Sequence, residues 1–214
     1  IIGAFALGHL VIVAILLVGL ARESQVGFPS WGFMGLFTRI PALALTGLFY
    51  NLGIWSDKFL FWWLSDHSVT VDGILRASPN YDVAIYLSLL SIIPGFATMF
   101  FFMETEFTRS FLHFFNQVDC GGSLAKLEDA KFKLMNSIQS GLKQLVTVQG
   151  ITTVALLICA ARLAERLGIG ALQQGVFSVT IIGTCLLLIF LFVLTILFYL
   201  NDIKGSLIST AVFF

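Results

Sequence analysis

The hydrophobic residues of this chain fall into long runs that are separated by shorter polar connections. A transmembrane helix needs about 20 consecutive apolar residues to cross the hydrocarbon core of a bilayer, and runs of this length recur along the chain. We therefore predict spans near 1–20, 36–64, 82–103, 144–163 and 176–200, with a sixth beginning near 205. The pattern indicates an all-α fold, a polytopic transmembrane helical bundle.

The composition supports lipid as the solvent for most of the chain. Hydrophobic residues make up 58% of the 214 positions and charged residues only 11%, whereas a soluble domain carries roughly a quarter charged residues. The chain begins at Ile1 and ends on the apolar run 207–214, so we expect a fragment, with about five to six spans, of a larger bundle. Residues 1–20 lack the features of a secretory signal and are expected to be a retained helix.

The basic residues are divided unequally between the two sides of the membrane. When connections are assigned to alternate sides, one side holds Arg22, Arg109, Lys126, Lys131, Lys133, Lys143 and Lys204, and the other holds Arg76, Arg162 and Arg166. Cytoplasmic loops carry an excess of Lys and Arg, which predicts that 21–34 and 104–143 are cytoplasmic and that 65–81 and 164–175 lie outside. Trp62 and Trp63 would then lie at the outer interface.

The long connection 104–143 has a helical pattern of its own. Cys120-Gly121-Gly122 interrupts the chain, and Ser123 is a candidate N-cap. Apolar residues then recur at helical spacing, at Leu124, Leu127, Leu134, Ile138 and Leu145. We predict an amphipathic segment at 119–143 that runs as a helix into the fourth span. It would be either a solvated extension of that span or a docking surface for a cytoplasmic partner.

The second predicted span carries polar side chains along one face. At about 100° per residue, one arc contains Arg39, Thr46, Tyr50, Gly53 and Asp57, flanked by Gly47, Asn51 and Lys58. The opposite side is apolar. A charged residue at mid-bilayer costs about 2.5–3.5 kcal/mol, so we expect the polar face to border the bundle interior or a wet cavity. Alternatively, Arg39 and Lys58 extend to opposite interfaces and Asp57 is neutralised by a neighbour.

The third predicted span shows a similar arc if its helix continues beyond Phe107. The arc contains Ser88, Ser91, Gly95, Phe102, Glu106, Arg109 and His113. Its small residues favour close helix packing, and Pro94 predicts a bend. Glu106 and Arg109 are spaced as an i,i+3 pair at the cytoplasmic mouth. They would serve either the transport path or only the membrane interface.

Other kinds of chemistry have little support in the sequence. The cysteines Cys120, Cys159 and Cys185 lie far apart and without metal-ligand spacing. No catalytic motif is found, and the formal net charge of zero gives no nucleic-acid footprint. We therefore expect no enzyme activity, no cofactor, no metal and no nucleic-acid partner. His9 in the first span is either a proton relay or a histidine bonded to a neighbour.

Three groups of residues carry a family resemblance. They are the segment 39–62, which reads RIPALALTGLFYNLGIWSDKFLFW, then Tyr81-Asp82 with Ser91-Ile-Ile-Pro94, and the segment 102–107, which reads FMETEF. Together they resemble the PelG family of Pel exopolysaccharide exporters. The resemblance implies a multi-pass protein of the bacterial cytoplasmic (inner) membrane, a flippase-like transporter with two helical lobes around a central cavity. It also implies a polysaccharide substrate, a cytoplasmic glycosyltransferase and membrane subunits of a synthase complex as partners.

The resemblance also suggests how the chain is divided. Residues 1–20 would end the preceding lobe, 21–34 would be a cytoplasmic linker, and 35–214 would form an incomplete second lobe. The predicted substrate path contains Arg39, Thr46, Tyr50, Asn51, Asp57, Lys58, Glu106 and Arg109. Two alternatives remain, an ion-coupled small-molecule antiporter and a non-transporting scaffold of a polysaccharide synthase. An antiporter needs a carboxylate deep in a dry site, and the predicted position of Asp57 is close to the outer surface.

Overall fold

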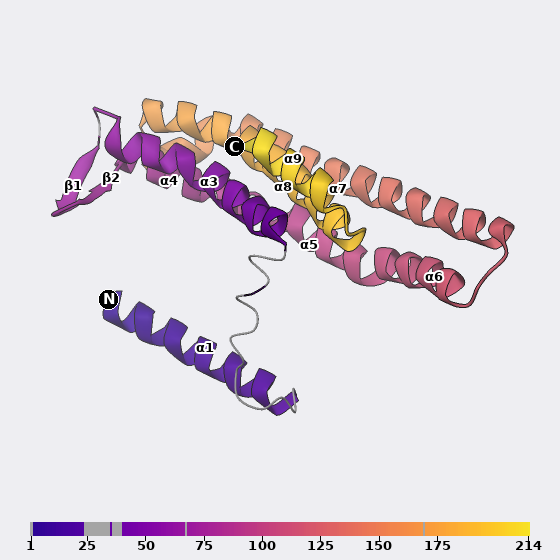
Figure 1. The fold of residues 1–214 in the computed structure, drawn as a ribbon. Coiled ribbons are helices and arrows are strands. Elements are labelled where there is room, and N and C mark those ends of the chain that lie inside the picture. Colours follow the sequence, from indigo (N-terminus) through magenta and orange to yellow (C-terminus); the bar gives the residue numbers. More distant parts are fainter. Residues whose placement is uncertain (1, 24–34, 36–39, 67, 169) are drawn as a thin grey trace. The chain divides into compact units, whose positions relative to one another are not determined.

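A computed structural model describes residues 2–23, 35, 40–66, 68–168 and 170–214. The chain forms two compact units, Ile1–Ala44 and Leu45–Phe214. Helix α1 (Ile2–Glu23) belongs to the first unit, and α3 (Pro41–Trp63) begins there and continues into the second. The second unit contains the hairpin strands β1 (Val69–Asp72) and β2 (Leu75–Ala77) and the helices from α4 to α9 (Figure 1).

The helices of the second unit are longer than the predicted spans. A nearly continuous helix runs through α4 (Pro79–Leu90), α5 (Ile93–Phe102), the π-helical turn η2 (Met103–Phe107) and α6 (Thr108–Asp119). It is followed by α7 (Leu124–Leu167), α8 (Ala171–Tyr199) and α9 (Ile203–Phe213). Three stretches in the described part of the chain are long and apolar enough to cross a membrane: Pro79–Asp119, Leu124–Arg166 and Ala171–Tyr199. The all-α membrane bundle is therefore confirmed.

The lengths of two of these helices correct the predicted boundaries. The stretches Pro79–Asp119 and Leu124–Arg166 have 41 and 43 residues, which is roughly 60 Å of helix at 1.5 Å per residue. The hydrocarbon core is only about 30 Å thick. The predicted spans 82–103 and 144–163 are therefore the apolar parts of helices that continue well beyond one crossing.

The extended parts of these two helices form a helical hairpin, α6 with the first half of α7, at one end of the unit (Figure 1). The Cys120-Gly121-Gly122 break is confirmed, because Gly121 turns the chain with a φ of 65° and the Gly122 N–H donates to the Gln117 carbonyl at 2.9 Å. The helix predicted to run into the fourth span is confirmed as α7. Ser123 occupies the N-cap position, but its side chain makes no capping hydrogen bond.

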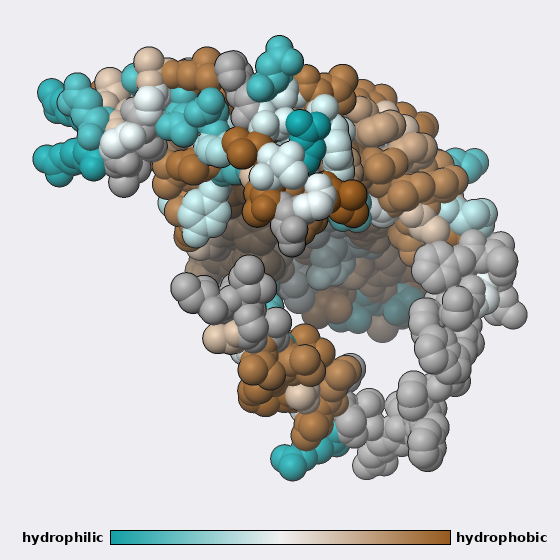
Figure 2. Space-filling model, turned by 90° about the vertical axis from the view of Figure 1, so that its left-hand side faces the viewer, coloured by the Kyte–Doolittle hydropathy of each residue, from teal (hydrophilic) through white to brown (hydrophobic). Residues whose placement is uncertain are grey.

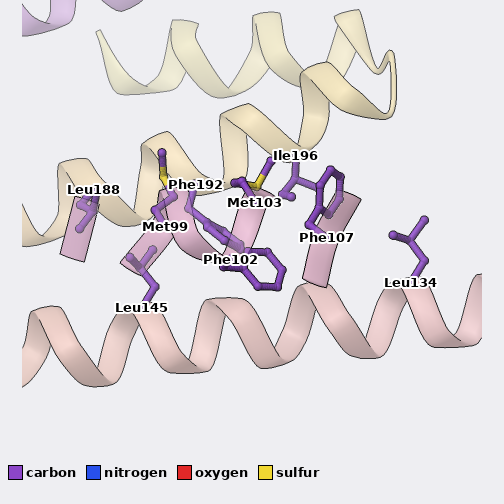
Figure 3. Close-up of a cluster of buried hydrophobic side chains, with 9 residues drawn as sticks. All are labelled: Met99, Phe102, Met103, Phe107, Leu134, Leu145, Leu188, Phe192 and Ile196. Atoms are coloured by element: carbon purple, nitrogen blue, oxygen red, sulfur yellow. The ribbon is translucent and has the colours of Figure 1, made fainter. Parts of the chain in front are cut away.

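The main core lies where the α5–η2 segment packs between α7 and α8 (Figure 3). Its buried side chains are Met99, Phe102, Met103, Phe107, Leu134, Leu145, Leu188, Phe192 and Ile196. The Phe102 ring packs directly against Gly141 of α7, where any larger residue would collide with it. The π-helical turn buries both Met103 and Phe107, which lie four residues apart and therefore on the same side of the helix.

Much of the outer surface is apolar. Large hydrophobic side chains such as Ile151, Ile158 and Val179 are exposed on α7 and α8. Figure 2 looks at the end of the unit where the β-hairpin lies and shows hydrophilic residues gathered at this end, with hydrophobic residues behind them. Soluble proteins rarely expose large apolar side chains in such numbers on neighbouring helices, whereas this is expected where helices face lipid.

The connection 65–81 contains the β-hairpin, which was not predicted from the sequence. The strands pair antiparallel, with Val69 opposite Ala77, Thr70 opposite Arg76 and Asp72 opposite Leu75. Gly73 adopts a φ of 53° at the turn, and an Asp-Gly dipeptide between two β-favouring segments is a recognised hairpin signal.

Candidate functional site

The predicted polar face of α3 lies against other helices of the second unit, where a cavity of about 350 Å³ opens between α3, α4, α8 and α9. Its polar lining residues are Asp57, Lys58, Tyr81, Thr180 and Thr184. The rest of the lining is apolar or glycine, contributed in part by Gly53, Ile85, Gly183, Leu187 and Phe213. The volume lies within the range of small-ligand sites, roughly 300–1,000 Å³.

Asp57 is the centre of the polar contacts in this cavity. One carboxylate oxygen accepts a short hydrogen bond from the Tyr81 hydroxyl of α4. The other accepts the backbone N–H of Lys58 at 2.8 Å and lies 3.4 Å from the Lys58 ammonium nitrogen. The Asp57 side chain is 41% exposed, so this ion pair contributes little to stability but places opposite charges side by side on the cavity wall.

Lys58 folds back onto its own helix. Its ammonium group donates to the Ile54 carbonyl at 2.9 Å and lies 5.5 Å from the centre of the Trp55 ring, a cation–π distance. Its side chain is only 17% exposed. The sequence allowed the alternative that Lys58 extends to a membrane interface and that Asp57 is neutralised by a neighbour. The position of Lys58 beside Asp57 agrees with the second part of this alternative and not with the first.

A second carboxylate fastens α3 to α4 beside the cavity. Asp82 accepts the Trp62 indole N–H at 3.0 Å and the Ser78 backbone N–H at 2.9 Å. The latter bond satisfies an unpaired donor at the start of α4. The Phe61 and Tyr81 rings stack with their centroids 4.0 Å apart. We call these contacts, together with the Asp57–Tyr81 bond, the α3–α4 clasp.

The middle of α3 meets α8 and α9 through a few side chains. Thr46 is buried, and Tyr50 stacks against Phe190 and Phe213, each with a centroid distance of 6.3 Å. A Cβ atom on Gly53 would lie 2.6 Å from the Phe213 ring, so this close approach requires glycine. This part of the polar face is therefore occupied by packing rather than open space.

The remaining predicted path residues lie elsewhere. Asn51 is exposed, and its amide donates back to the Gly47 carbonyl at 2.8 Å. Glu106 lies in η2 and Arg109 in α6, both exposed. No ion pair joins them in the part of the chain that the structure describes, because the π-helical turn changes the register that an i,i+3 pair needs. The predicted Glu106–Arg109 pair is therefore wrong. Arg39 lies outside the described residues.

The small residues of α4 and α5 form a buried polar seam with α7 and α8. Ser88 hydrogen-bonds Thr180, and the Ser91 and Thr184 hydroxyl groups lie 3.3 Å apart. At the break between α4 and α5, the Gln149 amide of α7 donates to the Ser91 carbonyl at 3.1 Å. Side chains of neighbouring helices commonly satisfy backbone groups freed at a proline break in this way. The predicted close packing at Ser88, Ser91 and Gly95 agrees with these contacts, and the helix is interrupted at Ser91 and Ile92, just before Pro94.

Three residues of the site were not identified from the sequence. Tyr81 and Asp82 form the clasp, and Gln149 is fully buried in the seam. A signal existed for Asp82, because an acidic residue in the first turn after Ser78-Pro79 is typical of a helix start. The partners of Tyr81 and Gln149 lie 24 and 58 residues away in the sequence, beyond the reach of any local pattern.

Long apolar helices, a polar seam between them and a charged cavity beside the clasp define a polytopic helical membrane protein. The family model PelG, described as "Putative exopolysaccharide Exporter (EPS-E)", matches residues 1–214. The chain therefore belongs to the PelG family of exopolysaccharide exporters, and the resemblance seen in segments 39–62 and 102–107 is confirmed. No curated protein and no solved structure matches the chain.

Proposed function

We propose that this chain forms part of the path by which an amino-sugar exopolysaccharide of the Pel type crosses the bacterial inner membrane. The observation that carries the proposal is the cavity between α3, α4, α8 and α9, which holds the charged residues Asp57 and Lys58 within an apolar helical unit. Ionisable groups inside a membrane bundle are costly and commonly mark a substrate path. Membership of an exporter family supplies the class of substrate.

The lining of the cavity suits weak and repeated contacts with a polymer. A polymer that slides through a path must bind only weakly at each point, because strong binding would stop its movement. Ion channels likewise bind each ion weakly enough to release it. Asp57, Tyr81 and Thr180 offer one carboxylate and two hydroxyl groups among apolar neighbours. Asp57 would attract the positive charge of an amino sugar, while Lys58 is withdrawn toward the Ile54 carbonyl and would repel it less.

The other predicted path residues have supporting parts in this proposal. Tyr50 positions α3 against Phe190 of α8 and Phe213 of α9, and Thr46 is buried on the same helix. Glu106 and Arg109 would face the polymer near the end of the path, at η2 and α6. Asn51 and Arg39 complete the proposed path on α3 and in the segment before it. The division of the chain into a preceding-lobe helix, a linker and a second lobe remains part of the same proposal.

The helical hairpin of α6 and α7 supports the proposed synthase partners. It extends the long helices beyond one bilayer crossing and carries Lys126, Lys131 and Lys133, all exposed. An exposed Lys133–Asp129 pair at 2.6 Å lies on the same surface. This surface would bind a cytoplasmic glycosyltransferase, while the lipid-facing helices would contact the membrane subunits of the complex.

The proposal is tested by measuring polymer export per exporter molecule. Asp57→Asn keeps the size of the side chain and removes its charge, and we expect several-fold less secreted polymer at an unchanged amount of membrane-inserted protein. Leu48→Ala is the matched control, because Leu48 lies on the exposed opposite face of α3 with 52% of its surface accessible. Wild-type export by Asp57→Asn, with Leu48→Ala also normal, would remove the cavity from the path.

A further inference from the structure

The β-hairpin presents an uncovered apolar surface at one end of the unit. Val69, Val71, Ile74 and Leu75 have 53%, 68%, 87% and 63% of their surface exposed. Ile74 forms the turn together with Gly73 and is therefore at the tip. Four large apolar side chains on a segment of nine residues form a patch rather than the scattered exposure that is normal on protein surfaces.

The strand register separates this surface into two different faces. Directly paired residues of an antiparallel ladder project to the same side, and residues two apart on one strand share a face. Val69 pairs with Ala77, and Leu75 lies two residues before Ala77, so these three residues share a face, and Asp72 pairs with Leu75 at the turn end of that face. Thr70 pairs with Arg76 on the opposite, polar face. The hairpin is therefore amphipathic at its base, where these two pairs lie, and the register shifts between Thr70 and Asp72 nearer the turn.

A hairpin of this kind needs a covering partner. An isolated two-stranded hairpin is marginally stable at best in water. Within the described residues, the hairpin's only sheet partners are its own two strands. Since no further strand in the described part of the chain covers the apolar face of the hairpin, we expect a surface outside this unit to cover it.

The position of the hairpin in the chain identifies that surface. Only Ser78 separates β2 from Pro79, the first residue of the 41-residue apolar stretch. Exposed Trp63 and Leu64 lie just before the hairpin, and exposed Tyr86 lies two turns into α4. Trp and Tyr are enriched where helices leave the hydrocarbon core. The hairpin therefore directly follows and precedes, along the chain, helix ends that carry exposed apolar and aromatic side chains.

We propose that the β-hairpin lies in the interfacial layer of the bilayer, with Ile74 and its apolar face among the lipid acyl chains and the Thr70–Arg76 face toward the headgroups and water. Arg76 suits this position, because a guanidinium group binds lipid phosphate oxygens well. The hairpin would fix the depth at which α3 ends and α4 begins, which is the level of the α3–α4 clasp. This inference does not depend on the transported substrate.

The test uses single cysteines labelled with the environment-sensitive fluorophore NBD. Cys120, Cys159 and Cys185 are first replaced by serine, and Ile74→Cys and Thr70→Cys are then made separately in the full chain. The proteins are reconstituted in vesicles of phosphatidylethanolamine and phosphatidylglycerol with or without doxyl-labelled lipid. We expect the label at position 74 to be blue-shifted and quenched at least threefold more by doxyl lipid than the label at 70, with aqueous iodide showing the reverse order.

The other outcomes decide against the proposal. Equal and strong iodide quenching at both positions would place the hairpin in water. A blue-shifted label at 74 without doxyl quenching would mean that a protein surface covers it, as in strand addition to a partner sheet. Leu75→Cys on the same apolar face repeats the measurement at a second position, so that a local effect of the label at the tip cannot decide the result.

Discussion

The close contact at Gly95 gives a prediction whose size follows from the structure. A Cβ atom at this position would come closer than 3.0 Å to both the Leu188 side chain of α8 and the Gln149 amide oxygen of α7. Real Cβ atoms essentially never approach other heavy atoms so closely. The fully buried Gln149 is held by its bond to the Ser91 carbonyl, so it cannot move aside without breaking that bond. Gly95→Ala should therefore destabilise the unit.

The magnitude is best measured as a difference between two glycine substitutions. Gly150 lies in α7, and a Cβ atom added there meets nothing within 4 Å. Both changes gain about 0.5–1 kcal/mol from replacing glycine in a helix, and this gain cancels in the comparison. The remaining difference is the cost of overpacking, about 1–3 kcal/mol, or roughly 5- to 150-fold in the unfolding constant.

Reversible unfolding of the purified protein in mixed detergent micelles, followed by circular dichroism, measures this difference. We expect Gly150→Ala to be as stable as the wild type or slightly more stable, and Gly95→Ala to unfold at clearly lower denaturant. Equal stability of the two variants would mean that α5 does not approach α7 and α8 as closely as described here. The positions of α5, α7 and α8 around the Gln149–Ser91 hydrogen bond would then differ from those in the structure.

Three further predictions concern orientation, partners and the clasp. Cysteines placed in 124–140 should react with an impermeant thiol reagent only from the cytoplasm and those in 66–80 only from outside, and reversed labelling would invert the topology. Charge reversal of the three lysines in 126–133 should reduce co-purification with the glycosyltransferase without changing membrane insertion; unchanged co-purification would make the α6–α7 hairpin a simple connector. In a double-mutant cycle of unfolding, Asp57→Asn and Tyr81→Phe should show a coupling energy of about 0.5–1.7 kcal/mol, the range for hydrogen bonds between membrane helices. Strictly additive effects of the two substitutions would show that the two residues do not interact.

Much of the helical architecture could be predicted because it depends on local composition. Apolar runs identify the membrane helices, and the glycine pair at 121–122 marks the turn between α6 and α7. The helix ends were predicted less well. The helical spacing of apolar residues predicted the helix at 124–143, whereas the polar residues at 108–119 are compatible both with a helix that continues outside the membrane and with a loop.

The site was predicted only as far as one helix can indicate it. The periodicity of α3 placed Gly53, Asp57 and Lys58 near one another, and the structure brings them to one cavity. It could not identify Tyr81 as the partner of Asp57, because that contact depends on how α3 and α4 pack. Nothing in the sequence indicated the π-helical turn at 103–107, which contains Glu106 and ends one residue before α6.

The central claim, that the cavity beside Asp57 belongs to the polymer path, is tested most directly by protection of a single cysteine. Gly183→Cys fits the cavity wall, since a Cβ atom there meets nothing within 4 Å, while Leu186→Cys on the same helix replaces a side chain that is 62% exposed on the apolar surface. With the native cysteines removed, a water-soluble thiol reagent should modify position 183, more slowly while polymer is being made, and leave position 186 unmodified. A reaction rate at 183 that is independent of polymer synthesis, or no reaction there at all, would contradict the account.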